Sequence, residues 1–280
     1  MLIRKIYYRL PLPLRILARK VISFPSDLVY YLTQPSNAMH PPKGKILIGS
    51  GDFIKQGEHQ LDLLIKYIGL ESHQHILDIG CGQGRTAVAL TQYLTAAGRY
   101  DGIDIMPDAI DWCQKRIQSR YPQFKFYLIE SDNQLYQTSD VINKDIRLTF
   151  SDHHFDKCFL FSVFTHLTQS FVSEYLFEIS RVLKQGEQCL CTMFIYDQEH
   201  EAYITSDNDG MTFPHDQGGY RLMSDQIEEA NVAYSKSLLL EMVDRAGMKM
   251  SHYVDGYWKD WVNKSDDNSF QDIVVLQKAP

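Results

Sequence analysis

The sequence lacks any apolar run long enough to cross a membrane and any cysteine spacing typical of a metal site. No uninterrupted apolar stretch approaches the ~20 residues of a spanning helix, and Arg15, Arg19 and Lys20 interrupt a signal-peptide core near the start of the chain. The five cysteines include no C-x-x-C pair, and no internal repeat or low-complexity tract is visible. These absences argue against a membrane-spanning protein, a secreted protein, a zinc module and a repeat array. Reduced core thiols favour a cytoplasmic protein.

The length and apolar content predict one folded domain with appendages. A chain of 280 residues with 44% apolar content can bury one sizeable core. Residues 1–48 are predicted to form a basic, proline-rich arm, because residues 1–45 hold eight Lys or Arg, six of the ten prolines and a single acid, Asp27. Residues 49–280 are predicted to form the domain.

The charge of the arm leaves two interpretations open. Residues 1–45 carry +7 and the whole chain −7, so the remainder carries −14. Residues 1–32 could lie on an anionic membrane surface as a peripheral contact. Alternatively, the arm packs against the acidic domain or against a second copy in a homodimer. Nucleic acid is not an expected partner, since the acidic remainder would repel phosphate.

The most informative stretch is ILDIGCGQGR, residues 76–85. It predicts a buried strand, a glycine loop and a helix over residues 86–97. Glycines at 80, 82 and 84 allow the backbone to take positive φ and to approach a ligand closely. Asp78 lies just before them, where a carboxylate would repel a pyrophosphate and attract a cation.

A dinucleotide-binding fold is the obvious competitor, because its fingerprint is also glycine-rich and follows a strand. Here the third glycine comes one place too early. Twenty residues after Gly84, Asp104 ends the strand-like YDGID and suits the two hydroxyls of a ribose. The pattern therefore favours a nucleoside with a sulfonium and an amino-acid tail over NAD.

These residues resemble the class I methyltransferases that depend on S-adenosylmethionine (SAM). ILDIGCGQGR and YDGIDI are similar to motif I and the acidic second motif of that family, residues 155–167 to its fourth strand and following loop, and RVLKQGE (181–187) to the turn before its fifth strand. Gln185 and Glu187 depart from the usual proline and glycine there. The resemblance covers roughly residues 50–278.

The resemblance implies a doubly wound α/β fold with a seven-stranded sheet, mostly parallel and with an antiparallel last pair. The pattern agrees, since strands alternate with helices. A helix over residues 58–70 leads into the first strand, Pro107 begins another helix, and the helix at 171–183 is expected to close at Gly186. The later strands are expected at 124–129, 155–161, 188–195, 248–254 and 271–277. An insertion at 196–234 follows the fifth strand and is expected to cover the substrate.

The resemblance also implies roles around the cofactor. Gly80, Cys81, Gly82 and Gly84 would surround the methionine part of SAM, and Asp78 would lie near its ammonium. Asp104 would accept hydrogen bonds from the ribose, and Ile105 would lie against the adenine.

Two further pairs follow the third and fourth strands. Glu130 and Ser131 would meet the adenine edge, with Asp132 as an alternative acid. Ser162 and Val163 would line the methionine side. For each of these acids, a helix cap or a solvated turn is the structural alternative.

Two groups are candidates for the base that removes a proton from an acceptor hydroxyl. His166 follows the fourth strand, in the loop expected to face the methyl group; it could equally pack beside the cofactor. His215 and Asp216 lie in the 196–234 insertion, where turn formation at the neighbouring glycines is the alternative. They could also bind a divalent metal, but two ligands do not make a site, so no metal is predicted.

The predicted function is SAM-dependent methylation of a hydroxyl on a small molecule, glycan or glycolipid, by in-line transfer with a general base. Three alternatives stay open: an N-methyltransferase of the same fold, a non-catalytic SAM-binding protein tethered through its basic arm, and an NAD oxidoreductase.

Overall fold

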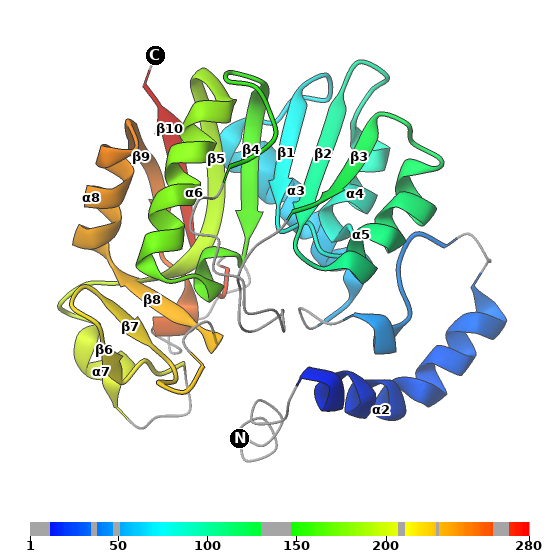
Figure 1. Ribbon diagram of the computed structural model, residues 1–280, viewed down its shortest axis with the longest axis horizontal. Coiled ribbons are helices and arrows are strands. Elements are labelled where there is room, and N and C mark those ends of the chain that lie inside the picture. Colours follow the sequence, from blue (N-terminus) through cyan, green and yellow to red (C-terminus); the bar gives the residue numbers. More distant parts are fainter. Residues whose placement is uncertain are drawn as a thin grey trace.

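The computed structural model describes residues 12–34, 38–46, 51–129, 147–206, 211–227, 230–259 and 269–279. Its centre is a sheet with helices on both faces (Figure 1). The main strands are β1 (His75–Ile79), β2 (Arg99–Asp104), β3 (Phe124–Leu128), β4 (Phe155–Phe161), β5 (Leu183–Tyr196), β9 (Met248–Val254) and β10 (Asp272–Lys278). The helices beside them are α3 (Phe53–Ile68), α4 (Arg85–Tyr93), α5 (Pro107–Cys113), α6 (Gln169–Val182) and α8 (Lys236–Arg245).

The order of the strands confirms the predicted fold. Strands β3, β2, β1, β4 and β5 are neighbours in that order and run parallel. Strand β10 pairs antiparallel with β5, and β9 pairs antiparallel with β10. The seven strands therefore form a doubly wound sheet whose last two strands pair antiparallel, and β10 alone runs against the other six.

Each face of this sheet has its own core, because successive side chains of a strand point to opposite faces. Leu77 and Ile79 of β1 pack in the cluster that includes residues of α6 and α8. Ile76 packs in the cluster that includes residues of α3, α4 and α5. Both faces of β1 are buried, which explains its almost continuous apolar sequence.

The strand count is higher than predicted, because the insertion adds three short strands. These are β6 (His215–Asp216), β7 (Tyr220–Leu222) and β8 (Val232–Ser235), here called the accessory sheet. Strand β10 covers β5 as far as Met193, and β8 pairs with residues 194–196 beyond that point. Strands of two to four residues are too short to show a two-residue period, so the sequence pattern does not reveal them. The insertion also contains helix α7 (Glu201–Thr205).

A buried ion pair holds the point where β5 passes from β10 to the accessory sheet. Lys259 Nζ lies 3.0 Å from Asp272 Oδ1 and donates to the carbonyl of Ile195 at 3.0 Å. The carboxylate of Asp272 also accepts from the Ile195 N–H at 2.6 Å and from the Trp258 indole at 2.7 Å. These partners offset the free-energy cost of burying the charges of Lys259 and Asp272, a cost that either charge would carry in full if it were buried unpaired.

Two predicted helix boundaries are corrected. Helix α3 begins at Phe53 rather than at Glu58, because Asp52 caps it by accepting from the N–H groups of Ile54 and Lys55. Gly186 does not close helix α6, which was predicted over residues 171–183. The helix ends at Val182, because Leu183 is extended and already pairs with Phe155 of β4.

The N-terminal segment contains helix α2 (Leu12–Thr33) and the short 3-10 helix η1 (Lys43–Lys45). Residues 38–46 contact the domain, where the indole of Trp112 donates to the carbonyl of Met39 at 3.1 Å. No helix among the described residues has both the length and the apolarity to cross a membrane.

The two appendages lie beyond the same edge of the main sheet. The strand arrows of the parallel sheet point toward the lower part of Figure 1, so the carboxyl ends of the strands lie there. The accessory sheet is at the lower left and α2 at the lower right. Ligands of open α/β sheets bind at this edge, so both appendages flank the expected site.

Candidate functional site

The glycine loop, residues 80–84, connects β1 to α4 and is fastened to the end of β2. The N–H groups of Gly80 and Cys81 donate to the carbonyl of Ile103 at 2.8 and 3.0 Å, and the Gly84 N–H donates to the carbonyl of Cys81. Gly80, Gly82 and Gly84 all have positive φ, at 77°, 51° and 77°. Such angles are readily adopted only by glycine, which explains the predicted pattern.

The three glycines differ in what surrounds them. A Cβ atom at Gly80 would lie 2.4 Å from Val163 Cγ2, and one at Gly84 would lie 2.5 Å from Ile117 Cδ1. A Cβ atom at Gly82 would meet nothing within 4 Å. Gly80 and Gly84 therefore permit close packing inside the protein, whereas Gly82 faces open space where a ligand can approach the backbone.

Asp104 ends β2 directly beside the glycine loop. Its carboxylate is buried and accepts from the N–H of Gly82 at 2.7 Å and from the N–H of Met106 at 2.9 Å. Burial raises the pKa of Asp104, while these backbone N–H groups partly oppose the rise. Each carboxylate oxygen has further lone-pair capacity for a ligand hydroxyl. The next residue, Ile105, is half-buried.

Asp78 is a second buried acid in the same place. The hydroxyl of Tyr100 donates to its Oδ2 at 2.6 Å. Burial raises the pKa of Asp78 to about 8; the Tyr100 hydrogen bond works against this rise, and the nearby charge of Asp104 adds to it. Two buried carboxylates with raised pKa values favour the arrival of a positive charge, which would stabilise their ionised forms.

Cys81 contributes backbone groups to the glycine loop, but its thiol is not reactive. Its side chain is buried and approaches the carbonyl of Gly82 at 3.7 Å, as does the thiol of Cys113 at 3.4 Å. Burial raises the pKa of Cys81 well above that of an ordinary thiol. All five cysteines are free and buried.

Ser162 and Val163, at the end of β4, lie against the glycine loop through the contact of Val163 with Gly80. Ser162 has a φ of 62°, which is uncommon for a residue with a side chain. Its N–H donates to Thr192 Oγ1 at 2.9 Å, and its hydroxyl donates to Gln271 Oε1 at 2.7 Å. Strained residues of this kind are concentrated at functional sites.

Three predicted residues of the adenine pocket, Glu130, Ser131 and Asp132, lie outside the described residues. The preceding residue, Ile129, donates its N–H to the carbonyl of Asp104 at 3.0 Å. The chain therefore leaves β3 beside the predicted ribose site. The roles of the three residues stay predictions.

Comparisons with known proteins agree with this geometry. Residues 77–191, which include the glycine loop, Asp104 and Ser162, match the family model described as a methyltransferase domain. These residues form a class I, SAM-dependent methyltransferase domain. SAM is accordingly its cofactor.

The curated relatives of the methyltransferase domain are distant. It is 26% identical over 135 residues to a 2-phytyl-1,4-naphtoquinone methyltransferase of Nostoc sp., covering 48% of this chain and 53% of the relative. It is 27% identical over 124 residues to a demethylmenaquinone methyltransferase of Lactiplantibacillus plantarum, covering 44% of this chain and 46% of the relative. The chain thus spans about half the length of the curated relatives it matches.

Solved structures share the fold over more of the chain. The cyclase SpnF has a TM-score of 0.54 at 15% identity, covering 93% of this chain and 97% of its own. A protein from Pyrococcus horikoshii has a TM-score of 0.53 at 16% identity, covering 90% and 99%. At such identities the likeness shows the fold alone.

The open glycine loop and the two acids of the methyltransferase domain fit SAM. SAM carries a sulfonium, an ammonium and a ribose diol, and the two buried carboxylates suit the positive charge and the diol. The backbone at Gly82 can approach the ligand because no neighbouring atom occupies that direction. The individual contacts of Asp78, Asp104 and Ile105 with SAM stay predictions.

The structure separates the candidate bases. His166 is the last residue of the 3-10 helix η3 (Phe164–His166). This helix begins directly after Val163, which contacts Gly80, and the N–H of His166 donates to the carbonyl of Val163. His215 and Asp216 lie in the accessory sheet as successive residues of β6, so their side chains point to opposite faces.

Asp216 and His215 have different surroundings. Asp216 Oδ1 accepts from the Gly218 N–H, and its Oδ2 lies 3.4 Å from the Arg221 guanidinium. It lines a pocket of about 360 Å³ at the end of β5, together with Tyr196, Asp197 and Glu201. His215 Nδ1 lies 3.9 Å from Asp225 Oδ2.

Sequence reasoning missed another histidine beside this pocket. His200 Nδ1 lies 2.5 Å from Asp197 Oδ1, and Asp197 follows the last residue of β5. A carboxylate that orients Nδ1 leaves Nε2 for proton transfer, which is the usual arrangement of a histidine base. The D-x-x-H spacing at a strand end was the available signal.

Two groups of described residues also have the composition of metal ligands. His75, Asp101 and His154 form one, and Asp197, Glu199 and His200 the other. In each group, a histidine and an aspartate pair directly, at 2.6 Å for His75 and Asp101 and at 2.5 Å for His200 and Asp197. These direct pairs explain why the residues of each group lie close together, so their closeness does not require a metal ion.

Proposed function

We propose that the protein transfers the methyl group of SAM to a small-molecule acceptor held over the carboxyl ends of β4 and β5. The observation that carries this proposal is the glycine loop with the two buried acids beside it. Asp104 would bind the ribose hydroxyls, and Asp78 would lie near the ammonium of SAM. Both carboxylates have raised pKa values, so a bound cation would favour their ionised forms.

Alignment is the main task of such a site, because the sulfonium already activates the methyl group. The protein must hold the acceptor atom, the methyl carbon and the sulfur in line and exclude water. Ser162 and Val163 suit this task, since Val163 contacts Gly80 while Thr192 and Gln271 fix Ser162. The accessory sheet would supply the cover over the acceptor.

We infer that the acceptor presents a hydroxyl, on a small molecule, glycan or glycolipid, and that a histidine removes its proton. His166 is the first candidate because it is close in sequence to the contact between Val163 and Gly80. His200 with Asp197, and His215 in the accessory sheet, would act only on an acceptor that reaches across β5. A base near neutral pKa suits this step.

A second candidate acceptor is a quinol, supported by the two curated relatives, whose names specify quinone-type compounds. Loss of a ring hydroxyl proton spreads negative charge over the oxygen and the ring carbons. The same base would then serve methylation at oxygen or at carbon. Mass and NMR analysis of the product distinguish these outcomes, and a methylated amine would identify an N-methyltransferase instead.

The test combines turnover with three histidine variants. The full chain is incubated with SAM and either catechol or reduced 2-phytyl-1,4-naphthoquinone, and release of S-adenosylhomocysteine is measured. We expect turnover with one of these probes, and a loss of about a hundredfold or more in kcat for His166→Ala with SAM affinity unchanged. His200→Ala and His215→Ala serve as matched variants.

Each result has a distinct meaning. Full turnover of His166→Ala with a large loss in His200→Ala or His215→Ala would move the base to the accessory sheet. Full turnover of all three variants would contradict a histidine base. SAM binding without turnover of any hydroxyl, carbon or amine probe would favour a non-catalytic SAM-binding protein, and binding of NADH in place of SAM would overturn the proposal.

A further inference from the structure

Helix α2 has the reverse of the usual surface-helix pattern. A surface helix normally turns its apolar side toward the protein and its polar side toward water. In α2, seven of the thirteen large apolar side chains that are exposed among the described residues lie within twelve positions: Val21, Ile22, Phe24, Leu28, Val29, Tyr31 and Leu32. Ile22 and Leu32 are 78% and 77% exposed.

The side of α2 that faces the protein is polar. Ser23, Ser26, Asp27 and Tyr30 are the half-buried residues between positions 21 and 34. Both carboxylate oxygens of Asp27 accept from the N–H of Gly44 at 3.1 Å, and the Tyr30 hydroxyl donates to the carbonyl of His40 at 2.7 Å. At 100° per residue these four positions form one stripe, and the apolar residues occupy the rest of the circumference.

The polar stripe fixes the direction in which the apolar face points. A Cβ atom at Gly44 would lie 2.3 Å from Asp27 Oδ2, so glycine is needed for this close approach. The segment that receives α2 is itself attached to the domain through Trp112 and Met39. The apolar face is therefore held away from the protein by specific contacts.

Charge decides between the partners that could cover an apolar face. Residues 1–45 carry +7 against −14 on the remainder. In α2 itself, Arg15, Arg19 and Lys20 precede the apolar stretch, and the only acid, Asp27, is turned inward. Pairing of two α2 helices would bring two strongly basic segments together. An anionic bilayer can bind both the basic residues and the apolar face, since its headgroups attract Lys and Arg and its acyl region accepts the apolar side chains.

We propose that the outward face of α2 docks on the surface of an anionic lipid bilayer as an in-plane helix. The helix lies beyond the carboxyl edge of the main sheet in Figure 1, so docking would bring that edge near the membrane. The proposal concerns the surface of α2 and stands whatever the methyl acceptor is.

The test is co-sedimentation of the full chain with vesicles of phosphatidylcholine alone or mixed with phosphatidylglycerol. We expect binding to the mixed vesicles that is at least tenfold stronger than to the neutral ones and that weakens in 0.5 M salt. The triple variant Ile22→Ser/Leu28→Ser/Leu32→Ser should lose at least tenfold in vesicle affinity. Because these side chains are exposed, SAM affinity measured by calorimetry should stay unchanged.

A matched control is Phe177→Ser on α6, which removes another exposed apolar side chain and should bind vesicles like the unaltered protein. The proposal is overturned if the unaltered protein ignores mixed vesicles, binds neutral vesicles equally well, or binds as strongly after the triple substitution. It is also overturned if sedimentation without lipid shows a dimer that the triple substitution dissociates. That result would assign the apolar face to a second copy.

Discussion

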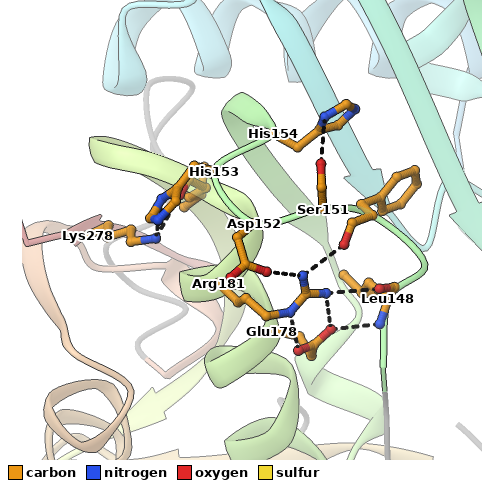
Figure 2. Close-up of polar contacts among 10 residues, drawn as sticks. Leu148, Ser151, Asp152, His153, His154, Glu178, Arg181 and Lys278 are labelled. Carbon is orange, nitrogen blue, oxygen red and sulfur yellow. Dashed lines mark hydrogen bonds and ion pairs between the residues drawn. The ribbon is translucent and has the colours of Figure 1, made fainter.

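The same strands form the two edges of the main sheet, but the pKa values of two carboxyl groups at one edge and two at the other are shifted in opposite directions. At the amino edge, Arg181 donates to both oxygens of Glu178, to Asp152 and to the carbonyls of Leu148 and Phe150 (Figure 2). The pKa values of Glu178 and Asp152 are lowered there. Burial is the largest single influence on Glu178 and opposes its ionised form, but the hydrogen bonds from Arg181 and from the Leu148 N–H, together with the charge of Arg181, outweigh it. At the carboxyl edge, Asp78 and Asp104 have raised pKa values because of burial.

This difference separates residues that stabilise the fold from residues that await a ligand. A carboxyl group with a lowered pKa adds stability above its ordinary pKa and loses that contribution as the pH falls through the folded value. A carboxyl group with a raised pKa costs stability once the pH exceeds its ordinary value. Asp78 and Asp104 therefore lower the free energy of unfolding at neutral pH, as expected where a cationic cofactor binds.

The largest predicted effect is at the amino edge. Arg181→Met should lower the free energy of unfolding by about 3 kcal/mol, because Glu178 and two backbone carbonyls lose their charged partner. Urea denaturation measures this change. SAM affinity of the folded variant should not change, since Arg181 lies at the opposite end of the strands.

The control for this prediction is Arg245→Met. Arg245 and Glu241 form an exposed pair one helical turn apart on α8, and such pairs contribute only about 0.5 kcal/mol. Equal losses for the two variants, or a large loss of SAM affinity in Arg181→Met, would show that the two edges are not separate in function.

The second prediction compares two aspartates of β2. Asp104→Asn should weaken SAM and S-adenosylhomocysteine binding by about tenfold to a hundredfold, because hydrogen bonds to a charged group contribute about 1.5–3 kcal/mol. Asp101, three residues earlier on β2, pairs with His75 at 2.6 Å. Asp101→Asn should lower stability by about 1–2 kcal/mol without changing cofactor affinity.

Calorimetric titration and thermal denaturation of both variants give the comparison. The assignment of the ribose contact is wrong if Asp104→Asn binds both ligands as tightly as the unaltered protein. It is also wrong if Asp101→Asn loses as much affinity, because the effect would then be a general loosening of β2.

The sequence was sufficient for those parts of the site that lie close together along the chain. Strand β1, the glycine loop and α4 follow one another within residues 75–93, and Asp104 is placed by ending the neighbouring strand. The glycine spacing indicates where the backbone must adopt positive φ, and the spacing of apolar residues indicates which strands and helices are buried. Both are properties of short windows, so the fold and the predicted cofactor edge follow from them.

The remaining features depend on contacts between residues far apart in sequence. Ser162 keeps its strained backbone through Thr192 and Gln271, which are 30 and 109 residues away. Tyr100 could not be recognised as the partner of Asp78 before β1 and β2 were placed in register. In the sequence Arg181 is recognisable only as part of a family motif, because its partners in the loop at residues 148–152 are about 30 residues away (Figure 2).

The smallest predicted effect tests the charge of Asp78 through pH. With a pKa of about 8, Asp78 is mostly protonated at neutral pH, and a bound ammonium would favour its ionised form. The association constant for SAM should therefore rise up to about tenfold between pH 6 and pH 7, and calorimetry in buffers of different ionisation enthalpy should show proton release. Above pH 8 the rise should end, because the ammonium of SAM begins to lose its own proton.

Two variants sharpen this pH dependence. Asp78→Asn should flatten it between pH 6 and pH 7, which would also exclude Asp104 as its source. Tyr100→Phe removes the hydrogen bond that opposes the raised pKa of Asp78, so less of Asp78 is ionised at pH 7 and SAM affinity at that pH should fall. A flat profile in the unaltered protein would mean that Asp78 does not face the ammonium. Its burial beside the glycine loop would then serve the connection between β1 and β2 through Tyr100.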